Sequence, residues 1–376
     1  MWKVAAAFFL LFSFCAIGSA SPSRVEVLYV EALSQPVEAK SLLYTYNVNP
    51  ETASAEQVGP VLGVPTTSID TLTIGSQHFI YLWNGTDVWI YTTNAQGMLN
   101  EQPLQHLQFG FPYPVISFLP DPDGKFAYAG LSWFNVNGNN AAVVLFTIDP
   151  STGYLTNTGK VVATYGPNGW VPITKFLFGV SGRRLYSYED YSGAPHSCGG
   201  AYFFYDVNRR TGSLGPDTPL VGWGDCGAYD TGTFSDTLTA VADAPLGRGS
   251  GTVVLNATFM GQTINCGPSM LAFCGDDAWT LSFDPASKNI FFGDLDTNLM
   301  AVGHIDFPEL RLLSTTSTIP SSDLSFSPDS KLIYAVTETD INIYAFNTNT
   351  GNTTASSLLP RNSISAHIGT ATLSGK

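Results

Sequence analysis

The sequence predicts an all-β fold built from a repeated four-stranded unit, and three observations predict it. Few windows space apolar residues at helical intervals without an interrupting glycine, proline or β-branched run, so helix signals are scarce. Short alternating or apolar runs bounded by turn residues recur along the whole chain. The 36 glycines and 23 prolines among 376 residues supply the many turns that short strands need.

The composition excludes disorder and argues against anionic partners. Hydrophobic residues make up 44% of the chain and charged residues only 12%, so a large core can form. The formal net charge of -14 repels phosphate backbones and anionic lipid headgroups. We therefore expect a globular protein that has no nucleic-acid partner.

The first residues have the pattern of a secretory signal peptide. Lys3 precedes an apolar stretch from Val4 to Ile17, and small residues follow up to Ala20. The stretch is shorter than the roughly 20 apolar residues that a spanning helix needs, and no later stretch is longer. We predict that residues 1–20 are the signal peptide and that residues 21–376 form a single domain, secreted or periplasmic, without a membrane span and monomeric.

The cysteines indicate disulfides. Removal of the signal peptide takes away Cys15 and leaves an even number, which in an oxidising compartment predicts two disulfide bonds. Three pairings are open, and we favour Cys198 with Cys226 and Cys266 with Cys274, because each pair is close in sequence. Since no C-x-x-C or Cys/His cluster occurs, the sequence predicts no zinc site.

The strand pattern repeats along the chain. The clearest unit, residues 323–351, reads as a strand, a Pro-Asp turn, a second strand, a polar turn, an alternating strand and a Thr-Gly turn. The same order recurs over residues 118–153, 176–212 and 281–302. The opening phenylalanines Phe118 and Phe176 are 58 residues apart, and Phe283 and Phe326 are 43 apart. A period of roughly 40 to 60 residues with four strands per unit predicts a β-propeller.

The remaining segments complete the count of units. Residues 66–110 and 227–275 each hold a weaker unit. Residues 25–64 supply only three strands, and residues 364–373 can supply the missing innermost one. Pairing the two ends removes an open sheet edge. We therefore predict a seven-bladed β-propeller with four-stranded blades, whose ring is closed by the N- and C-terminal strands in one blade.

The units resemble a known family. Asp-Gly-Lys or Asp-Ser-Lys before a tyrosine-containing strand, then an alternating strand that ends in Asp or Asn and a Thr-Gly turn, is similar to the YVTN-repeat and lactonase-like seven-bladed propellers. The resemblance covers most of residues 66–360 and is strongest over residues 118–162 and 323–351. It implies either a lactone hydrolase, of the phosphogluconolactonase or muconate-lactonising kind, or an extracellular propeller without catalytic activity.

Two residues that the resemblance implies are missing. The family is expected to place a histidine ahead of an inner strand, yet residues 166–175 keep only the Gly-Pro turn. The expected arginine after a Tyr-Val strand is also absent from the segment that ends at Glu338. We therefore rank a non-catalytic module that binds a small molecule, glycan or protein at the axial mouth ahead of a lactone hydrolase. A cell-envelope scaffold without a pocket is the third hypothesis.

One polar segment offers candidate catalytic residues. Glu189, Asp190 and His196 lie within a predicted loop, and a carboxylate and an imidazole form an acid/base pair if the loop folds toward the axis. Arg183 or Arg248 would assist as a cation. The alternative is a disulfide-tethered surface loop with a solvated histidine.

The aromatic residues suggest a binding surface. Most of them occupy alternating strand positions and are expected in the core. Trp133, Trp170 and Trp223 fall in predicted loops and are therefore the candidates for binding, together with Arg183 and Arg248.

The sequence contains only an incomplete pattern for a metal site. Residues 294–298 begin like a calcium loop, but Leu299 replaces the required glycine and Ile305 the required glutamate, so a polar hairpin is expected. A group of loop aspartates could attract a cation: Asp225, Asp230, Asp276 and Asp277. We predict no metal ligands and no cofactor, with calcium as a weak alternative.

Three segments match the acceptor motif for N-linked glycans. They begin at Asn84, Asn256 and Asn352. The motif has meaning only if the host glycosylates its secreted proteins, and a chance match in a chain rich in Asn and Thr is the alternative.

Overall fold

The computed structural model describes most of the chain and leaves the N-terminal segment and many connections undescribed. It covers residues 25–33, 40–65, 68–74, 77–94, 96–135, 138–165, 173–178, 182–190, 200–216, 218–222, 239–243, 252–257, 262–266, 278–285, 288–294, 299–306, 309–317, 323–336, 340–360 and 366–373. Within these ranges there is no helix, and none of the described segments therefore offers a helix long and apolar enough to cross a membrane.

Four sheets share one build, in which four antiparallel strands follow one another in chain order. The first contains β5 (Ser68–Ile74), β6 (Gln77–Trp83), β7 (Asp87–Thr92) and β8 (Gln105–Gln108). The second contains β9 (Val115–Pro120), β10 (Phe126–Asn135), β11 (Gly138–Ile148) and β12 (Leu155–Tyr165). The third contains β13 (Ile173–Phe178), β14 (Arg184–Asp190), β15 (Gly200–Asp206) and β16 (Thr218–Gly222). The fourth contains β24 (Asp323–Phe326), β25 (Leu332–Val336), β26 (Asp340–Phe346) and β27 (Thr353–Pro360).

A fifth sheet combines strands from both ends of the chain. In it β1 (Val25–Leu33) pairs with β28 (Ala366–Leu373) on one side and with β2 (Lys40–Val48) on the other. Two short strands, β3 (Ala55–Gln57) and β4 (Leu62–Pro65), both pair with β2. The N- and C-terminal strands therefore share one sheet.

The last sheet has seven strands and joins two antiparallel groups. One group is β17 (Thr239–Asp243), β18 (Thr252–Ala257) and β19 (Gln262–Cys266). The other is β20 (Ala278–Phe283), β21 (Asn289–Asp294), β22 (Leu299–Asp306) and β23 (Glu309–Ser317). The link is a short parallel contact of β19 with β23.

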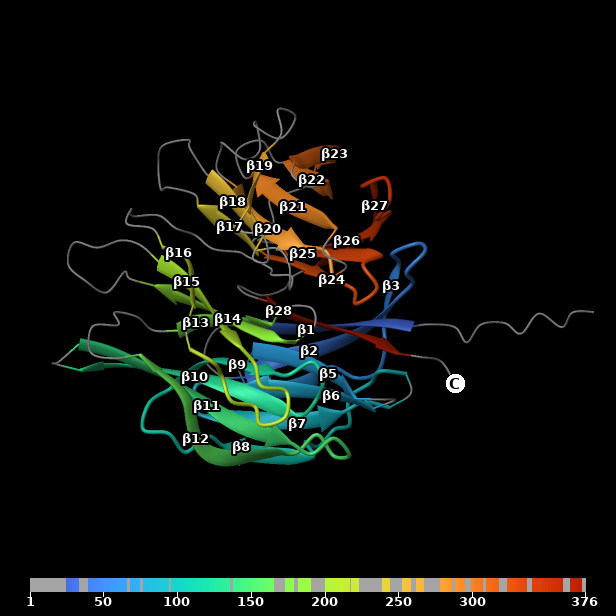
Figure 1. The fold of residues 1–376 in the computed structure, drawn as a ribbon. Helices are drawn as coiled ribbons and strands as arrows, with labels where there is room; N and C mark the ends of the chain where they lie inside the picture. The colour runs from blue at the N-terminus through green and yellow to red at the C-terminus, as the bar shows by residue number, and fades with distance from the viewer. Residues whose placement is uncertain are drawn as a thin grey trace, which may run out of the picture.

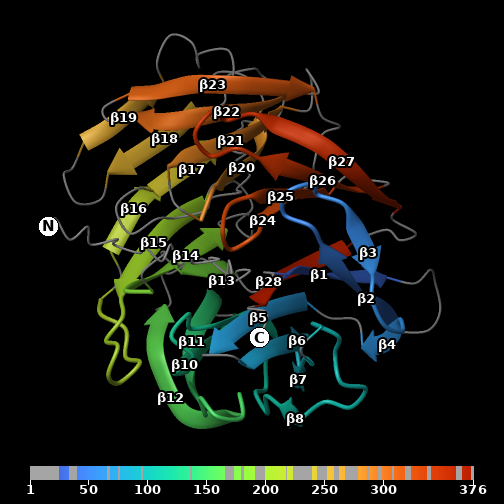
Figure 2. The same ribbon diagram turned by 90° about the vertical axis from the view of Figure 1, so that its right-hand side faces the viewer.

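The sheets are arranged around a common centre (Figure 1). Figure 2 shows β5, β13, β24 and β28 toward that centre and β8, β12, β23 and β27 on the outside. The inner strands contact one another in the order β24, β28, β5, β9, β13, and β20 contacts both β17 and β24. Four-stranded antiparallel sheets placed radially are typical of a β-propeller. The all-β prediction is therefore confirmed, and the prediction of four strands per sheet is confirmed for the four sheets whose strands follow chain order.

Buried tyrosines connect successive sheets. Each lies on the strand next to the innermost one and donates its hydroxyl to a glycine carbonyl in a turn of the following sheet. Tyr29 bonds Gly97 at 2.8 Å, Tyr81 bonds Gly153 at 3.0 Å, and Tyr128 bonds Gly212 at 3.0 Å. All three tyrosines are fully buried, and an unmade bond at such a site costs about 1–3 kcal/mol.

An ion pair links two further turns. The Nη1 atom of Arg209 donates to Asp121 Oδ1 at 2.6 Å and to the Gly182 carbonyl at 2.7 Å, and its Nη2 atom pairs with Asp123. Asp121 is completely buried. Burial raises the pKa of Asp121, and the Arg209 guanidinium offsets part of that rise. The β9–β10 turn is thereby fastened to the sheet that begins with β13.

Aromatic packing fills the space between the sheets that begin with β5 and β9. The ring centroids of Phe109 and Phe118 are 5.8 Å apart, and those of Phe118 and Phe146 are 6.4 Å apart. All three side chains are buried. These phenylalanines therefore belong to the core, which strand alternation predicts for Phe118 and Phe146 but not for Phe109, because Phe109 follows the end of β8.

Candidate functional site

The candidate site begins with the direction of the innermost strands. Each four-stranded sheet is entered by its innermost strand, so the first residues of β5 and of its counterparts surround the centre at one end. In the β5 sheet, Ser68 is opposite Trp83, and Ile74 at the other end is opposite Gln77. Ser68 and Trp83 therefore lie at the end of the sheet where its innermost strand begins, and Asp70 follows within the same strand.

Asp70 lies on β5, near the end at which this strand begins. Side chains alternate along a strand, so Asp70 shares a face with Leu72, whose cluster includes Phe118 of β9. Ile69 instead belongs to the cluster on the opposite side, with Tyr29. Asp70 consequently faces the inner edge of the interface between the β5 and β9 sheets.

A tryptophan fixes the Asp70 carboxyl group. The indole Nε1 of Trp83 donates to Asp70 Oδ2 at 2.7 Å. The Trp83 ring is itself held by Phe118, with 6.2 Å between the ring centroids. The carboxyl group is thus oriented by a side chain that packs into the core.

The environment of Asp70 changes its protonation. Asp70 keeps part of its surface accessible, but protein atoms crowd the carboxyl group, and this loss of hydration is what matters for its charge. Burial raises the pKa of Asp70 to about 7, and the hydrogen bond from Trp83 opposes the rise. A carboxyl group with a pKa near neutrality can both hold and accept a proton under ordinary conditions.

Asp70 is not among the site residues that the sequence predicts. It lies in the segment of residues 66–110, where the repeat is weak. The available signal was an acidic residue in the middle of a strand, on the same face as Leu72, where an apolar side chain is expected. Only the tertiary contacts show that this carboxyl group is desolvated.

The predicted catalytic residues lie at or beyond the end of the described range 182–190. The backbone of Glu189 pairs with Ile173, the first residue of β13, just as Trp83 pairs with the first residue of β5. Asp190 is the last residue of β14. The side chains of both, and all of His196, are outside the described residues. Their role as an acid/base pair stays a prediction.

The candidate binding residues have different positions. Arg183 precedes β14, at the opposite end of that strand from Glu189. Trp133 lies within β10, where its backbone pairs with Asn140, so the prediction that it falls in a loop is wrong. The reason is that the ladder of the β10–β11 hairpin continues through the polar residues up to the pair of Asn135 and Gly138. Trp170, Trp223 and Arg248 lie outside the described residues.

The cysteines and acidic residues are only partly described. Cys266 ends β19, where its backbone pairs with Leu310, whereas Cys198, Cys226 and Cys274 lie outside the described residues, so the disulfide pairing stays a prediction. Asp294 and Leu299 pair across the β21–β22 hairpin, in agreement with the hairpin expected there. The described part of the chain contains no group of three potential metal-ligating side chains. The undescribed aspartates are Asp225, Asp230, Asp276 and Asp277.

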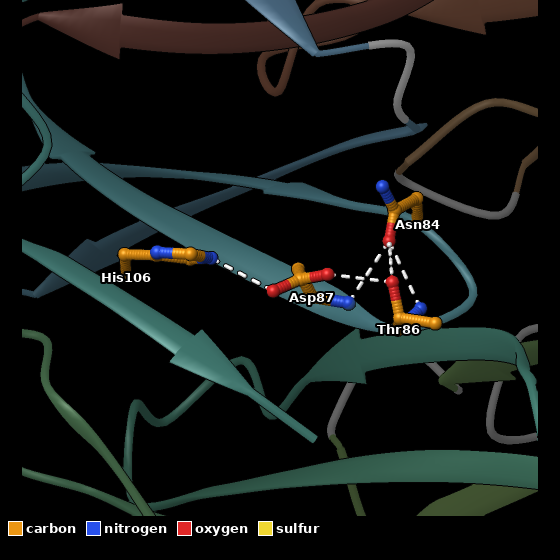
Figure 3. Close-up of polar contacts among 4 residues, drawn as sticks. All are labelled: Asn84, Thr86, Asp87 and His106. Atoms are coloured by element: carbon orange, nitrogen blue, oxygen red, sulfur yellow. Dashed lines mark hydrogen bonds and ion pairs between the residues drawn. The ribbon is translucent and has the colours of Figure 1, made fainter. Parts of the chain in front are cut away.

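A second polar cluster lies away from the centre, around the start of β7 and on β8 (Figure 3). His106 Nε2 is 2.8 Å from Asp87 Oδ1, and the Thr86 hydroxyl is 2.5 Å from Asp87 Oδ2. Partial burial acts to raise the pKa of Asp87, but hydrogen bonds from Thr86 and His106 outweigh it and hold that pKa below its usual value. The carboxylate stands between the hydroxyl and the imidazole, so His106 cannot act as the base for Thr86 as in a nucleophilic triad. We therefore assign this cluster no catalytic role.

Comparisons with solved structures support the fold. The periplasmic gluconolactonase of Pseudomonas aeruginosa has a TM-score of 0.61 at 15% identity, over 92% of this chain and 99% of that one. A 6-phosphogluconolactonase-like protein from Bacteroides fragilis has a TM-score of 0.61 at 14% identity, over 94% and 99%. A hypothetical selenium-binding protein from Sulfolobus tokodaii has a TM-score of 0.62 at 9% identity, over 94% of both chains.

No protein-family model matches the chain, and no curated protein matches it significantly. At these identities the structural likeness shows a lactonase-like propeller fold. Because the neighbours differ in their named functions, the activity has to be argued from the site.

Proposed function

We propose that the protein is an exported lactonase-like propeller that binds a small polar molecule at the axial mouth, with Asp70 as the contacting carboxyl group. The observation that supports this most is the position of Asp70 on the innermost strand β5, held by Trp83 and with a pKa near 7. A partly accessible carboxyl group with this pKa can donate a hydrogen bond to a ligand oxygen when it is protonated and accept one from a ligand hydroxyl when it is ionised. The net charge of -14 and this acidic group favour an uncharged ligand over a phosphorylated one.

We also propose that the blades form a closed ring and that there are seven of them. The five sheets with a single group of strands count as five blades, and the seven-stranded sheet counts as two. Pairing of β1 with β28 supports closure through the terminal strands. In this arrangement all innermost strands face one axis, and the mouth is shared by several blades.

Hydrolysis of a cyclic ester is the second candidate. The pKa of Asp70 favours it, because a general base works best when its pKa is near the operating pH. Asp70 would take a proton from water, the water oxygen would attack the lactone carbonyl, and the ring C–O bond would break as the leaving oxygen is protonated. Glu189, Asp190, His196 and Arg248 are the further groups proposed for this chemistry.

Larger ligands are the remaining options. A glycan or a protein would require the loop aromatics Trp170 and Trp223 to face the mouth, as proposed from the sequence. A glycan would stack on such rings, whereas a small polar molecule would depend on Asp70.

A thermal-shift comparison tests the binding proposal. The oxidised protein and its Asp70→Asn variant are melted with aldonolactones, muconolactones, simple glycans and divalent cations. A ligand at 100 times its Kd stabilises the native state by about 2.7 kcal/mol, which raises the midpoint detectably. We expect an uncharged lactone to stabilise the unaltered protein and to stabilise Asp70→Asn much less. Asp87→Asn, which changes an aspartate away from the centre, is the matched control and should respond like the unaltered protein.

Turnover separates the two candidates. Lactone opening releases a proton, so the rate is followed by pH-stat against the uncatalysed rate. A hydrolase shows a rate that rises through pH values near 7 and is lost in Asp70→Asn. Binding without turnover supports the binding module without catalytic activity. Equal binding by the unaltered protein and Asp70→Asn shows that Asp70 is not part of the binding site.

A further inference from the structure

The connection between β6 and β7 contains one of the three glycosylation motifs. Asn84, Gly85 and Thr86 fill the turn between Trp83, which ends β6, and Asp87, which begins β7. Thr86 is exposed, and Asn84 and Gly85 are half-buried. The motif therefore lies at the tip of a hairpin, the kind of surface position at which N-linked glycans are carried.

The turn uses only the oxygen of the Asn84 side chain. Asn84 Oδ1 accepts hydrogen bonds from the backbone N–H groups of Thr86 and Asp87, each at 2.9 Å. The Thr86 hydroxyl lies 3.1 Å from the same oxygen and closer, at 2.5 Å, to Asp87 Oδ2. The amide nitrogen of Asn84 points away from the other three residues drawn in Figure 3 and takes part in none of these hydrogen bonds of the turn.

This geometry tolerates substitution of the amide nitrogen. Attachment of a sugar replaces one hydrogen on Nδ2 and leaves Oδ1 as an acceptor, so both backbone hydrogen bonds of the turn persist. The turn is also anchored independently of that nitrogen, since Gly85 accepts from Val115 N at 2.8 Å and Thr86 accepts from Phe109 N at 2.8 Å. A glycan would therefore cost the folded hairpin none of these interactions.

We propose that Asn84 is an N-glycosylation site of the exported protein. The donor is an oligosaccharide linked to a polyprenyl diphosphate. The Asn84 amide nitrogen forms a bond to the C1 atom of the sugar, the bond from C1 to the diphosphate oxygen breaks, and the amide proton goes to a base of the transferase. Since Asn84 follows Trp83, the glycan stands at the end of the sheet where β5 begins.

The other two motifs have different surroundings. Asn256 is in β18, and its backbone pairs with Thr239 on one side and Thr263 on the other. A bulky glycan is harder to accommodate on a strand inside a sheet than at a hairpin tip. Asn352 is exposed, in the turn before β27. Occupancy must therefore be mapped site by site.

Peptide mapping after secretion tests the proposal. The full chain is placed behind a yeast secretion leader, and the secreted protein is digested and analysed by mass spectrometry before and after treatment with a peptide N-glycosidase, which converts a glycosylated asparagine to aspartate. We expect the peptide that contains Asn84 to carry a glycan in most of the molecules. Secreted protein in which Asn84 is predominantly unmodified overturns the proposal.

Matched variants separate the motif from the fold. Thr86→Ser keeps the motif and the hydroxyl and should remain glycosylated at Asn84. Asn84→Asp keeps an oxygen acceptor for the turn but removes the amide nitrogen, and it should lose one glycan and still be secreted. Thr86→Ala keeps Asn84 and should lose the same glycan. A glycan that persists on Asn84 in Thr86→Ala contradicts assignment through this motif.

Discussion

Single residues at the turns carry much of the contact between neighbouring sheets. Gly153 has a φ of 70°, in the left-handed region, and a Cβ atom built there would lie 2.4 Å from the Phe79 ring. Its carbonyl also accepts the hydrogen bond from Tyr81. Position 153 therefore requires glycine for its backbone conformation and for the close approach of Phe79 in the preceding sheet.

Replacement of this glycine should destabilise the protein strongly. Gly153→Ala combines left-handed strain of about 1–2 kcal/mol with an overpacking cost of about 1–3 kcal/mol. Gly159→Ala is the control, because Gly159 also has a positive φ of 67° but nothing lies within 4 Å of its Cβ position. Urea unfolding of both variants measures the difference. Equal losses would show that Phe79 does not restrict position 153.

The tyrosine hydroxyl of the same contact gives a second prediction. Tyr81→Phe removes the donor and leaves the buried Gly153 carbonyl unsatisfied, so stability should fall by about 1–3 kcal/mol. Tyr154→Phe alters a tyrosine that is 40% exposed and should change stability by less than about 0.5 kcal/mol. If urea unfolding shows an equally small loss of stability for Tyr81→Phe and Tyr154→Phe, the stabilising role of the Tyr81–Gly153 hydrogen bond is contradicted.

Asp70 predicts a pH dependence of stability. Its folded pKa of about 7 lies above the ordinary value of 3.8, so between these values the folded state binds more protons than the unfolded state. The contribution of Asp70 to stability is therefore complete below the unfolded pKa and is lost as pH rises through the folded pKa. Asp70→Asn removes the dependence, so its melting midpoint relative to the unaltered protein should rise from acidic to neutral pH. Melting midpoints that change with pH in the same way in both proteins would contradict the raised pKa of Asp70.

At the scale of elements, the structure shows how turns fasten one sheet to the next. Arg209 reaches from the sheet that contains β13 to the buried Asp121 after β9. The Gln105 side chain bonds both backbone groups of Leu155 in the following sheet, at 2.8 and 3.0 Å. Such contacts hold adjacent sheets in place relative to one another.

Loss of the Arg209 side chain should destabilise the protein, and a second substitution at Asp121 should restore part of the lost stability. Arg209→Met leaves the Asp121 carboxyl group buried without its partner, which costs about 3–5 kcal/mol. Asp121→Asn in the same background removes the buried charge and should recover part of this loss. A double-mutant cycle in urea measures the coupling, and additive effects would show that the two residues act independently.

The sequence predicted many strands but not every connection. The unit at residues 323–351 predicts β24, β25 and β26, because its turn residues and alternation are local signals. The Asn-rich segment around residues 131–140 reads as a loop, yet the ladder continues there because backbone pairing does not require apolar side chains. The parallel contact of β19 with β23 joins residues over 40 positions apart and has no local signal.

At the scale of the whole molecule, the fold and the candidate site differ in how far the sequence predicts them. Strand periodicity predicts radial four-stranded sheets, and the pairing of β1 with β28 follows from a missing strand at the N-terminus. Asp70 was not predicted because its pKa depends on atoms from the β6 and β9 regions, which only the folded chain brings together. The arrangement shows one oriented carboxyl group of raised pKa on an innermost strand, which is the basis of the proposal.

The ionisation of Asp70 tests this account most directly. Its carboxyl carbon can be followed by ¹³C NMR across neutral pH, with the Asp70→Asn variant assigning the resonance, in the absence and in the presence of gluconolactone. The account predicts a midpoint of about 7 that moves when the lactone binds. A midpoint near the ordinary aspartate value of 3.8, unchanged by the lactone, would contradict both the desolvated carboxyl group and its role at the mouth.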